Sequence, residues 1–242
     1  MAKTQEKTTM DLTPVTNFDL TKMKEGSDDI KESLKGITIR LPLVKFISTA
    51  GIFELPDGSK SEGFTGLVIE HHRTNSYWDV PFEDTGGGTP PLCFSIDAVQ
   101  PSKASQEMQH DNCIECRHNK FGSEILKGGG KGPGKACRNI IQIHFVVTDS
   151  QFLPFRIQLS PSSITNWDKY VSAIASMGKP YFGVFTKFSA QPASSSAGIK
   201  YHKVDFSTNG GISDDQILMV KAIAKEMYPI MHDEVRQEEM AG

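Results

Sequence analysis

The chain has 242 residues, of which 38% are hydrophobic and 23% charged, and its formal net charge is −3 at pH 7. This composition excludes disorder throughout, and the length allows one sizeable core with a small second one. No apolar run approaches the roughly 20 residues that span a bilayer, and the start MAKTQEKTTMDL lacks a signal-peptide pattern, so we expect a cytoplasmic protein.

The N-terminal half reads as an arm followed by strands. Residues 1–36 are polar without periodicity and predict a flexible arm with a short helix. Alternating β-branched residues over 37–55 predict one long strand that bends near Pro42. Residues 64–80 predict a second strand, and residues 91–97 predict a third after the turn signal GGGTPP.

The C-terminal half alternates between strands and helices. Residues 139–148 and 155–160 predict a hairpin. A helix follows, because Ser160 and Pro161 form a start signal and an apolar stripe runs to Gly178: Ile164, Trp167, Tyr170, Val171, Ile174 and Met177. Trp167 is expected in the core. Two strands over 180–190 and 199–207 precede a helix that begins with a Ser213–Gln216 capping box and ends near Pro229.

This order of elements predicts a mainly β (α+β) fold. Several strands, one helix and two more strands with short turns are typical of an OB-type five-stranded Greek-key barrel. We expect an arm over 1–36, an OB-type domain over 37–208 and a C-terminal helix with an acidic tail over 209–242. The cysteine-bearing segment 93–137 is expected to be a zinc-ribbon-like insertion in that domain.

All four cysteines lie in this segment, at positions 93, 113, 116 and 137. A C-x2-C spacing lets two thiolates meet one ion, and structural disulfides are rare in a reducing cytoplasm. The segment also has few apolar residues for a core of its own, so a metal would supply its folding energy. The sequence therefore predicts Zn²⁺ held by Cys93, Cys113, Cys116 and Cys137.

Alternatives to the four-cysteine site remain open. His110 or His118 would serve zinc as well as one of the cysteines does. A thioredoxin-like redox pair lacks its βαβ context. The stretch Gly129–Ala136 resembles a phosphate loop, but Ala136 stands where a Ser or Thr must hold Mg²⁺, and a cysteine follows instead of a helix.

Charge is unevenly distributed along the chain. From Arg117 to Arg138 there are six basic residues against one acidic residue, a balance of +5. From Ser213 to the end there are seven acidic residues against three basic ones, a balance of −4. The basic segment favours contact with phosphates, and the acidic tail favours competition with DNA or docking of replication and recombination proteins.

The cysteine segment resembles a family of bacteriophage-encoded proteins that bind single-stranded DNA. The shared elements are a strand cysteine, the C-x2-C pair, Asn119, the Phe-Gly-Ser at 121–123 and the Lys-Ala-Cys-Arg-Asn at 135–139. A zinc site within a barrel is also similar to the plan of phage helix-destabilising proteins and of the large subunit of replication protein A. The resemblance covers about residues 37–208; the loop GGGKGPG is longer than the family pattern.

Binding of a single strand without sequence preference needs a basic groove and aromatic faces. The candidates on the expected strands and in the insertion are Arg40, Lys45, Arg73, Tyr77, Trp78, Arg117, Lys120, Lys131, Lys135, Arg138, Tyr181, Phe185, Lys187, Lys200, Tyr201 and Lys203. Tyr77 and Trp78 lead this set, because they adjoin polar turn residues.

We therefore expect a single-stranded DNA-binding protein that protects and organises DNA in phage replication or recombination. The runner-up is a zinc-ribbon adaptor that binds replication or transcription proteins; a metal-dependent nuclease ranks lowest. His71 and His72 point to opposite faces of a strand and are read as structural. No carboxylate pair or Ser-His-Asp pattern suggests catalysis, so no enzymatic activity is expected.

Overall fold

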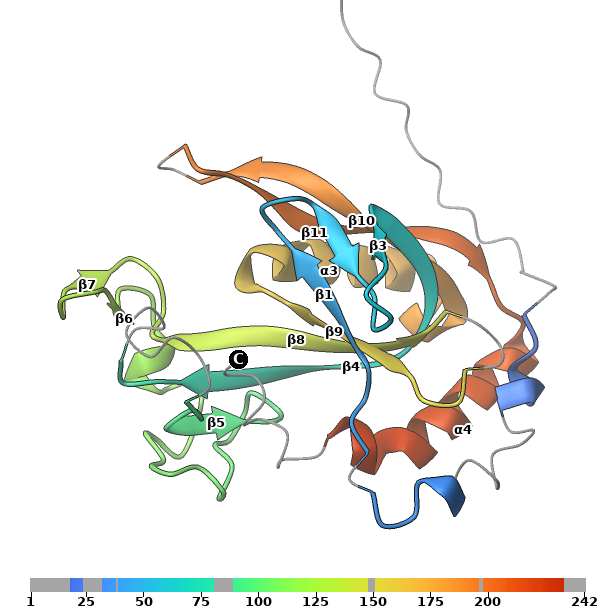
Figure 1. Cartoon of the computed structure of the whole chain (residues 1–242), viewed down its shortest axis with the longest axis horizontal. Coiled ribbons are helices and arrows are strands. Elements are labelled where there is room, and N and C mark those ends of the chain that lie inside the picture. Colours follow the sequence, from blue (N-terminus) through green and yellow to red (C-terminus); the bar gives the residue numbers. More distant parts are fainter. Residues whose placement is uncertain are drawn as a thin grey trace, which may run out of the picture. The chain divides into compact units, whose positions relative to one another are not determined.

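The computed structural model describes residues 18–23, 32–37, 39–80, 89–147, 151–195 and 198–232 (Figure 1). Most of the expected arm, the glycines of the GGGTPP turn and the acidic tail after His232 lie outside the described residues. Neither described α-helix combines the length and hydropathy that crossing a membrane requires.

Strands dominate the described residues. They are β1 (Leu43–Ile47), β2 (Ile52–Glu54), β3 (Lys60–Ser61), β4 (Gly63–Tyr77), β5 (Cys93–Ser95), β6 (Glu124–Ile125), β7 (Lys131–Gly132), β8 (Cys137–Val146), β9 (Phe155–Leu159), β10 (Val184–Ser194) and β11 (Lys200–Gly211). The helices are α3 (Pro161–Ser176) and α4 (Asp214–Met231), with short 3-10 turns η1 (Leu20–Met23), η2 (Arg117–Asn119) and η3 (Tyr181–Gly183). The prediction of a mainly β chain with helices is confirmed at this level.

One sheet contains nine of the described strands. Its order is β11-β10-β4-β8-β9-β1-β2-β3, and β5 pairs with the end of β4 through Tyr77↔Cys93. β10 runs antiparallel to β4 and to β11, whereas β1 runs parallel to β9. The sheet is strongly curled into a half-barrel (Figure 1). β6 and β7 form a separate two-stranded sheet.

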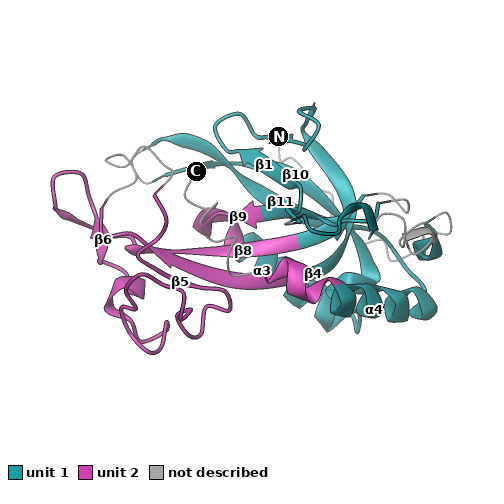
Figure 2. Ribbon diagram, turned by 60° about the horizontal axis from the view of Figure 1, so that its bottom comes forward, with its two compact units in different colours: residues 1–70, 144–157, 165–226 teal, residues 71–143, 158–164, 227–242 magenta. Residues whose placement is uncertain are grey.

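The chain divides into two compact units (Figure 2). Unit 1 comprises residues 1–70, 144–157 and 165–226, and unit 2 comprises residues 71–143, 158–164 and 227–242. The boundaries fall inside the continuous strands β4 and β8. Unit 2 therefore contains the whole connection between these two strands, including all four cysteines.

Aromatic side chains form the core of unit 1. The Phe64 ring stacks on Phe188 at 4.5 Å and on Phe145 at 5.1 Å between centroids. Trp167 of α3 is fully buried, as expected, and meets the Phe206 ring of β11 edge-on at 5.0 Å. The apolar stripe of α3 thus covers the inner side of the β10–β11 hairpin, which fixes the helix to the curled sheet.

The segment 37–55 differs from the prediction of a single bent strand. It forms the antiparallel pair β1 and β2, with Phe46 opposite Phe53. The chain reverses at Gly51, whose φ of +69° is unfavourable for residues with a side chain. The β-branched alternation continues on both sides of this turn and therefore gave no signal of it.

Both helices confirm their predicted starts but differ at their ends. α3 begins at Pro161 as expected, and Met177 lies just beyond its end with 42% of its surface exposed. In α4 the Ser213 amide donates to Gln216 Oε1 (3.0 Å) and the Gln216 amide donates to Ser213 Oγ (3.3 Å), which is the predicted capping box. α4 continues through Pro229 to Met231, two residues past the expected end.

A short part of the N-terminal segment packs into unit 1. Leu20 is buried, and the Phe18 ring meets Phe185 edge-on at 5.0 Å. Gln216 Nε2 donates to the Phe18 carbonyl at 2.6 Å, so the start of α4 holds this segment. The low hydropathy of the surrounding residues concealed this contact in the sequence.

Candidate metal centre and nucleic-acid interface

The four cysteines of unit 2 line one small cavity. Cys93 lies at the start of β5, Cys113 and Cys116 bracket a turn, and Cys137 begins β8. Cys113, Cys116 and Cys137 are buried, and Cys93 is partly exposed. The cavity has a volume of about 20 Å³, which accepts one water-sized species.

The sulfur atoms are not at the spacing of a formed metal site. Zn–S bonds of about 2.3 Å in a tetrahedron place sulfurs about 3.8 Å apart. Among the described residues, no three cysteine sulfurs lie within 4.8 Å of one another. The backbone thus gathers the four residues around one cavity, while binding of an ion would require the side chains to draw closer.

Hydrogen bonds shape the C-x2-C turn. The Ile114 amide donates to Asn112 Oδ1 at 2.8 Å, and the Cys116 amide donates to the Asn112 carbonyl at 3.1 Å. Asn119 Nδ2 donates to the Cys113 carbonyl at 2.7 Å. These bonds hold the two cysteines on the inner side of the turn, where both are buried.

A polar network joins this turn to the ends of β4 and β8. Asn139 Nδ2 donates to Asn75 Oδ1 at 2.6 Å. Lys135 Nζ donates to Asn139 Oδ1 at 2.9 Å and to Asn119 Oδ1 at 3.1 Å. Lys135 therefore serves as the centre of a structural network beside the cysteines, which the sequence did not indicate.

The thiols of the cavity influence one another electrostatically. Burial raises the pKa of Cys137 to about 12, with further increases from the charges of Cys113, Cys116 and Cys93. Burial also raises the pKa of Cys113, and hydrogen bonds from Ser95 and Asn75 partly oppose this increase. In the absence of a cation, both thiols are therefore protonated at neutral pH.

The two histidines considered as alternative ligands lie in different surroundings. His110 lines the cavity together with the cysteines, and its Nδ1 accepts a hydrogen bond from the Asn112 amide at 3.0 Å. His118 is not among the residues that line the cavity; its ring packs on Tyr77 at 4.0 Å. Burial, Arg117 and Lys131 lower the pKa of His118, so its ring is neutral at pH 7. Of the two, only His110 is positioned beside the sulfurs.

The glycine-rich stretch forms a hairpin. Gly128 and Gly129, both with φ of +87°, turn the chain between β6 and β7, and no helix follows them. The Gly134 amide donates to Glu124 Oε2 at 2.9 Å, and a Cβ at Gly132 would collide with the same carboxylate. Glu124, the lone acidic residue of the basic segment, thus packs its carboxylate against two glycines of the hairpin.

A polar cleft of about 620 Å³ opens within unit 1. The turn after β1, the corner before β4 and the strands β10 and β11 form its walls. Lys187, His202 and Glu62 are the charged or titratable side chains of its lining. The His202 amide donates to the Ser48 carbonyl at 2.8 Å, which ties β11 to the β1–β2 turn.

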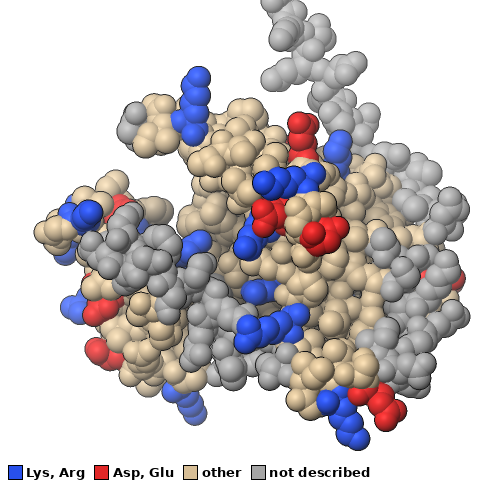
Figure 3. All heavy atoms as spheres, viewed as in Figure 1, with Lys and Arg blue, Asp and Glu red and all other residues tan. Residues whose placement is uncertain are grey.

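The predicted DNA-contacting residues of unit 1 are mostly accessible. Arg40, Lys45, Lys187 and Lys200 are exposed, and Tyr181, Tyr201 and Lys203 are partly exposed. Lys203 Nζ lies 5.9 Å from the centre of the Tyr201 ring. Phe185 is only 6% exposed, so its ring offers no face to a base. Figure 3 shows basic side chains gathered over the region of β1 to β3, with acidic side chains among them.

The predicted DNA-contacting residues of unit 2 also include both accessible and buried side chains. Those exposed are Arg73, Arg117, Lys120, Lys131 and Arg138. Tyr77, one of the two leading candidates, is 6% exposed and packs on His118, because β5 and the cysteine loop cover it. Trp78 is partly exposed, and its Nε1 donates to the Thr89 carbonyl at 2.8 Å. Because both rings are buried, Tyr77 and Phe185 are not part of the proposed interface.

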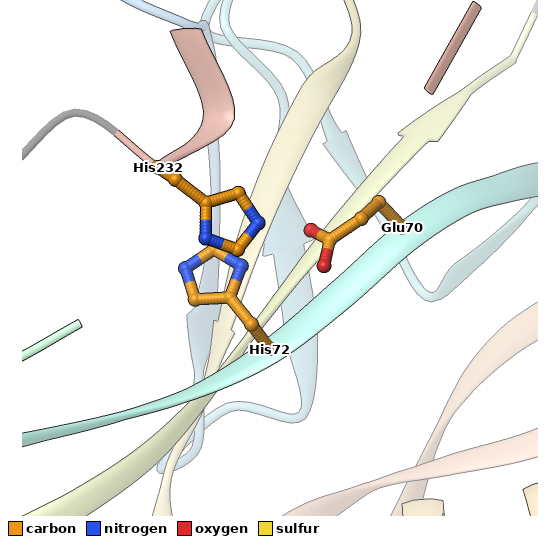
Figure 4. Close-up of side chains that lie close together, drawn as sticks. All are labelled: Glu70, His72 and His232. Carbon is orange, nitrogen blue, oxygen red and sulfur yellow. The ribbon is translucent and has the colours of Figure 1, made fainter. Parts of the chain in front are cut away.

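The structural role expected of His71 and His72 stays a prediction, and the structure places His72 beside another histidine. His72 packs against His232 at the end of α4, with 3.9 Å between ring centroids (Figure 4). His232 also stacks on Tyr228 at 4.0 Å. Glu70, two residues before His72 on the same strand face, accepts a hydrogen bond from His144 at 3.1 Å.

A comparison with models of protein families, with curated proteins and with solved structures found no match.

Proposed function

We propose that this protein binds single-stranded DNA without sequence preference, through an OB-type barrel with a zinc-stapled insertion. The observation that carries the proposal is the order of elements. β4, β8 and β9 lie side by side, α3 follows β9, and the β10–β11 hairpin returns to the other side of β4. Three adjacent strands, a helix and a hairpin that returns to the first strand are also found in an OB barrel. In the described part of this chain, however, β11 ends the sheet and β9 pairs with β1, so the support concerns the order of the strands and not barrel closure.

This assignment gives a role to two connections. In OB folds, nucleic acid is bound by the loop between the first two strands and the loop between the last two. Here these are the cysteine-bearing connection from β4 to β8 and the tip of the β10–β11 hairpin. Both connections carry lysines that the sequence singled out: Lys131 on the first and Lys200 on the second.

The β10–β11 hairpin offers the chemistry that a single strand needs. Gln191 pairs with Lys203 and Ala193 pairs with Tyr201, so these side chains share one face with Lys187. The Lys187 side chain is exposed and its ammonium makes no hydrogen bond or ion pair with a described residue, so it is a candidate phosphate contact. Two carboxylates lie on the same side: Asp205 pairs with Ser189, and Glu62 lines the cleft together with Lys187.

We further propose that Cys93, Cys113, Cys116 and Cys137 hold a structural Zn²⁺. The supporting observation is that all four line one cavity in a segment with few buried apolar side chains. Bound zinc would supply folding energy to this segment. His110, on the wall of the same cavity, is the alternative ligand.

The cellular role follows from the resemblance of the cysteine segment to phage single-stranded DNA-binding proteins. We propose a binding protein, without catalysis, that protects and organises DNA during phage replication or recombination in the host cytoplasm. The acidic residues beyond His232 would engage replication or recombination proteins.

A titration with fluorescent oligo-dT and with a duplex of equal length, at two salt concentrations, tests this function. We expect tighter binding of oligo-dT and a steep loss of affinity with salt. Equal or absent binding of both probes would overturn the proposal.

Two substitutions test the hairpin face that Lys187 and Lys203 share. Replacing both by alanine removes two candidate phosphate contacts, whereas Lys200, which pairs with Ser194, lies on the opposite face. Each such contact contributes about 0.7 to the slope of log affinity against log salt for single strands, so the slope should flatten by about 1.4. Lys169→Ala, an exposed lysine on α3, is the matched control and should leave the slope unchanged.

A further inference from the structure

Phe121 has the largest exposed fraction, 82%, of any large apolar side chain in the described residues. Exposed apolar side chains are common on protein surfaces, so its exposure alone carries no function. Three further features distinguish this ring: its backbone is held by hydrogen bonds, a cation lies beside it, and the surrounding segment is basic.

The turn that carries Phe121 is fixed to the hairpin strands. The Gly122 amide donates to the Gly134 carbonyl at 2.9 Å. Ser123 Oγ donates to the His118 carbonyl at 2.9 Å and accepts from the Ala136 amide at 3.0 Å. Because the backbone on both sides is held, a ligand that binds the ring has little loop entropy to remove.

One face of the ring is already occupied. Lys135 Nζ lies 5.2 Å from the centre of the Phe121 ring. The same ammonium is held by Asn119 and Asn139, so it cannot easily swing away from the ring. The cation therefore orients the ring, and the large exposed fraction leaves the remaining surface accessible to a second planar group.

The charges of the surrounding segment favour one class of ligand. Arg117, Lys120 and Lys131 are exposed and lie within the segment of balance +5. An apolar protein surface docking on Phe121 would have to desolvate these cations, which is costly. A single nucleic-acid strand supplies phosphates for the cations and a base for the ring.

We infer that Phe121 is a base-stacking residue, and that the cysteine-bearing insertion forms a contact with single-stranded DNA separate from the β10–β11 hairpin. This inference rests on the proposed function. It replaces the buried Tyr77 as the aromatic contact of unit 2, and it assigns Lys135 to positioning the ring instead of to binding a phosphate.

The test measures binding of oligo-dT and of an abasic oligonucleotide of equal length. Phe121→Ala should weaken oligo-dT binding by about 5- to 150-fold, the range observed for loss of one base stack. The same variant should bind the abasic oligonucleotide almost as tightly as the parent does, because the phosphate contacts remain. The salt dependence of binding should not change. Phe121→Tyr should retain the parent affinity.

A control and a direct probe separate stacking from general apolar contact. Ile114 is 64% exposed and lies in the cysteine-bearing segment 93–137. Ile114→Ala should therefore bind oligo-dT with the affinity of the parent. Phe121→Trp should show fluorescence quenching upon binding, beyond that of the parent with its two tryptophans.

Each result decides one claim. If the parent does not bind oligo-dT, the proposed function fails. If the parent binds but Phe121→Ala is unchanged, or Phe121→Trp binds without added quenching, only the stacking inference is overturned. Equal losses in Phe121→Ala and Ile114→Ala would also overturn it, in favour of an apolar protein-docking surface.

Discussion

Unit 1 and the connection between β4 and β8, which is the cysteine-bearing part of unit 2, are stabilised by different interactions. In unit 1, Phe53, Phe145 and Phe188 are fully buried and contribute to a continuous aromatic core. In the described residues between β4 and β8, the buried apolar side chains are Pro91, Phe94, Cys113 and Cys116. Apolar burial therefore stabilises unit 1, whereas this connection depends on hydrogen bonds and, as we propose, a metal ion.

The largest expected effect is that of metal removal. Structural zinc contributes about 10 kcal/mol or more to the folding of small domains. A chelator at neutral pH should therefore remove hydrogen-exchange protection from the connection between β4 and β8, while β10 and β11 stay protected. Elemental analysis should find one zinc per chain before treatment.

Cys113→Ser should reproduce the effect of the chelator. Met108→Ala, a 54% exposed residue of the same connection, is the control and should retain the metal. Protein that contains no zinc, or equal loss of protection in both units, would contradict the proposed metal site.

The next effect concerns the aromatic core. Phe188→Ala removes a fully buried ring and should lower the free energy of unfolding by about 3–5 kcal/mol. Phe121→Ala makes the same chemical change at an exposed site and should alter stability by less than about 0.5 kcal/mol. Denaturant titration measures both; similar losses would show that the two rings do not differ as described.

The smallest effect concerns the polar network of unit 2. Asn139→Ala removes the donor to Asn75, whose side chain is 3% exposed, and leaves its amide oxygen unsatisfied. This should cost about 1–3 kcal/mol and should appear first as faster hydrogen exchange in unit 2.

Asn209→Ala is the matched control in unit 1. It removes an exposed hydrogen bond to Thr65 and should change stability by less than about 0.5 kcal/mol. An Asn139 variant as stable as this control would mean that the network contributes nothing.

Local patterns predicted much of the fold. The start of α3 at Pro161 and the Ser213–Gln216 capping box both appear as expected, because each depends on residues within one helical turn. Trp167 was correctly placed in the core by helical periodicity. The reversal at Gly51 was missed, since strand residues on both sides of it show the same alternation.

The exposure of aromatic residues was harder to predict. Alternation along a strand says which side chains share a face, but which face is covered depends on other elements. Tyr77 is buried because β5 pairs with the end of β4, and Phe185 is covered by Phe18 from a distant part of the chain. Neither contact leaves a signal in the sequence around these two residues.

The sequence by itself determined the strand and helix segments, the clustering of the cysteines and the basic character of the 117–138 segment, because these follow from neighbouring residues. Only the tertiary structure decided that four cysteines separated by up to 44 positions line one cavity, that Lys135 is held by Asn119 and Asn139, and that Phe121 stays exposed. The physical reason is that burial and hydrogen-bond partners depend on which distant segments pack together, and local patterns carry no record of that packing.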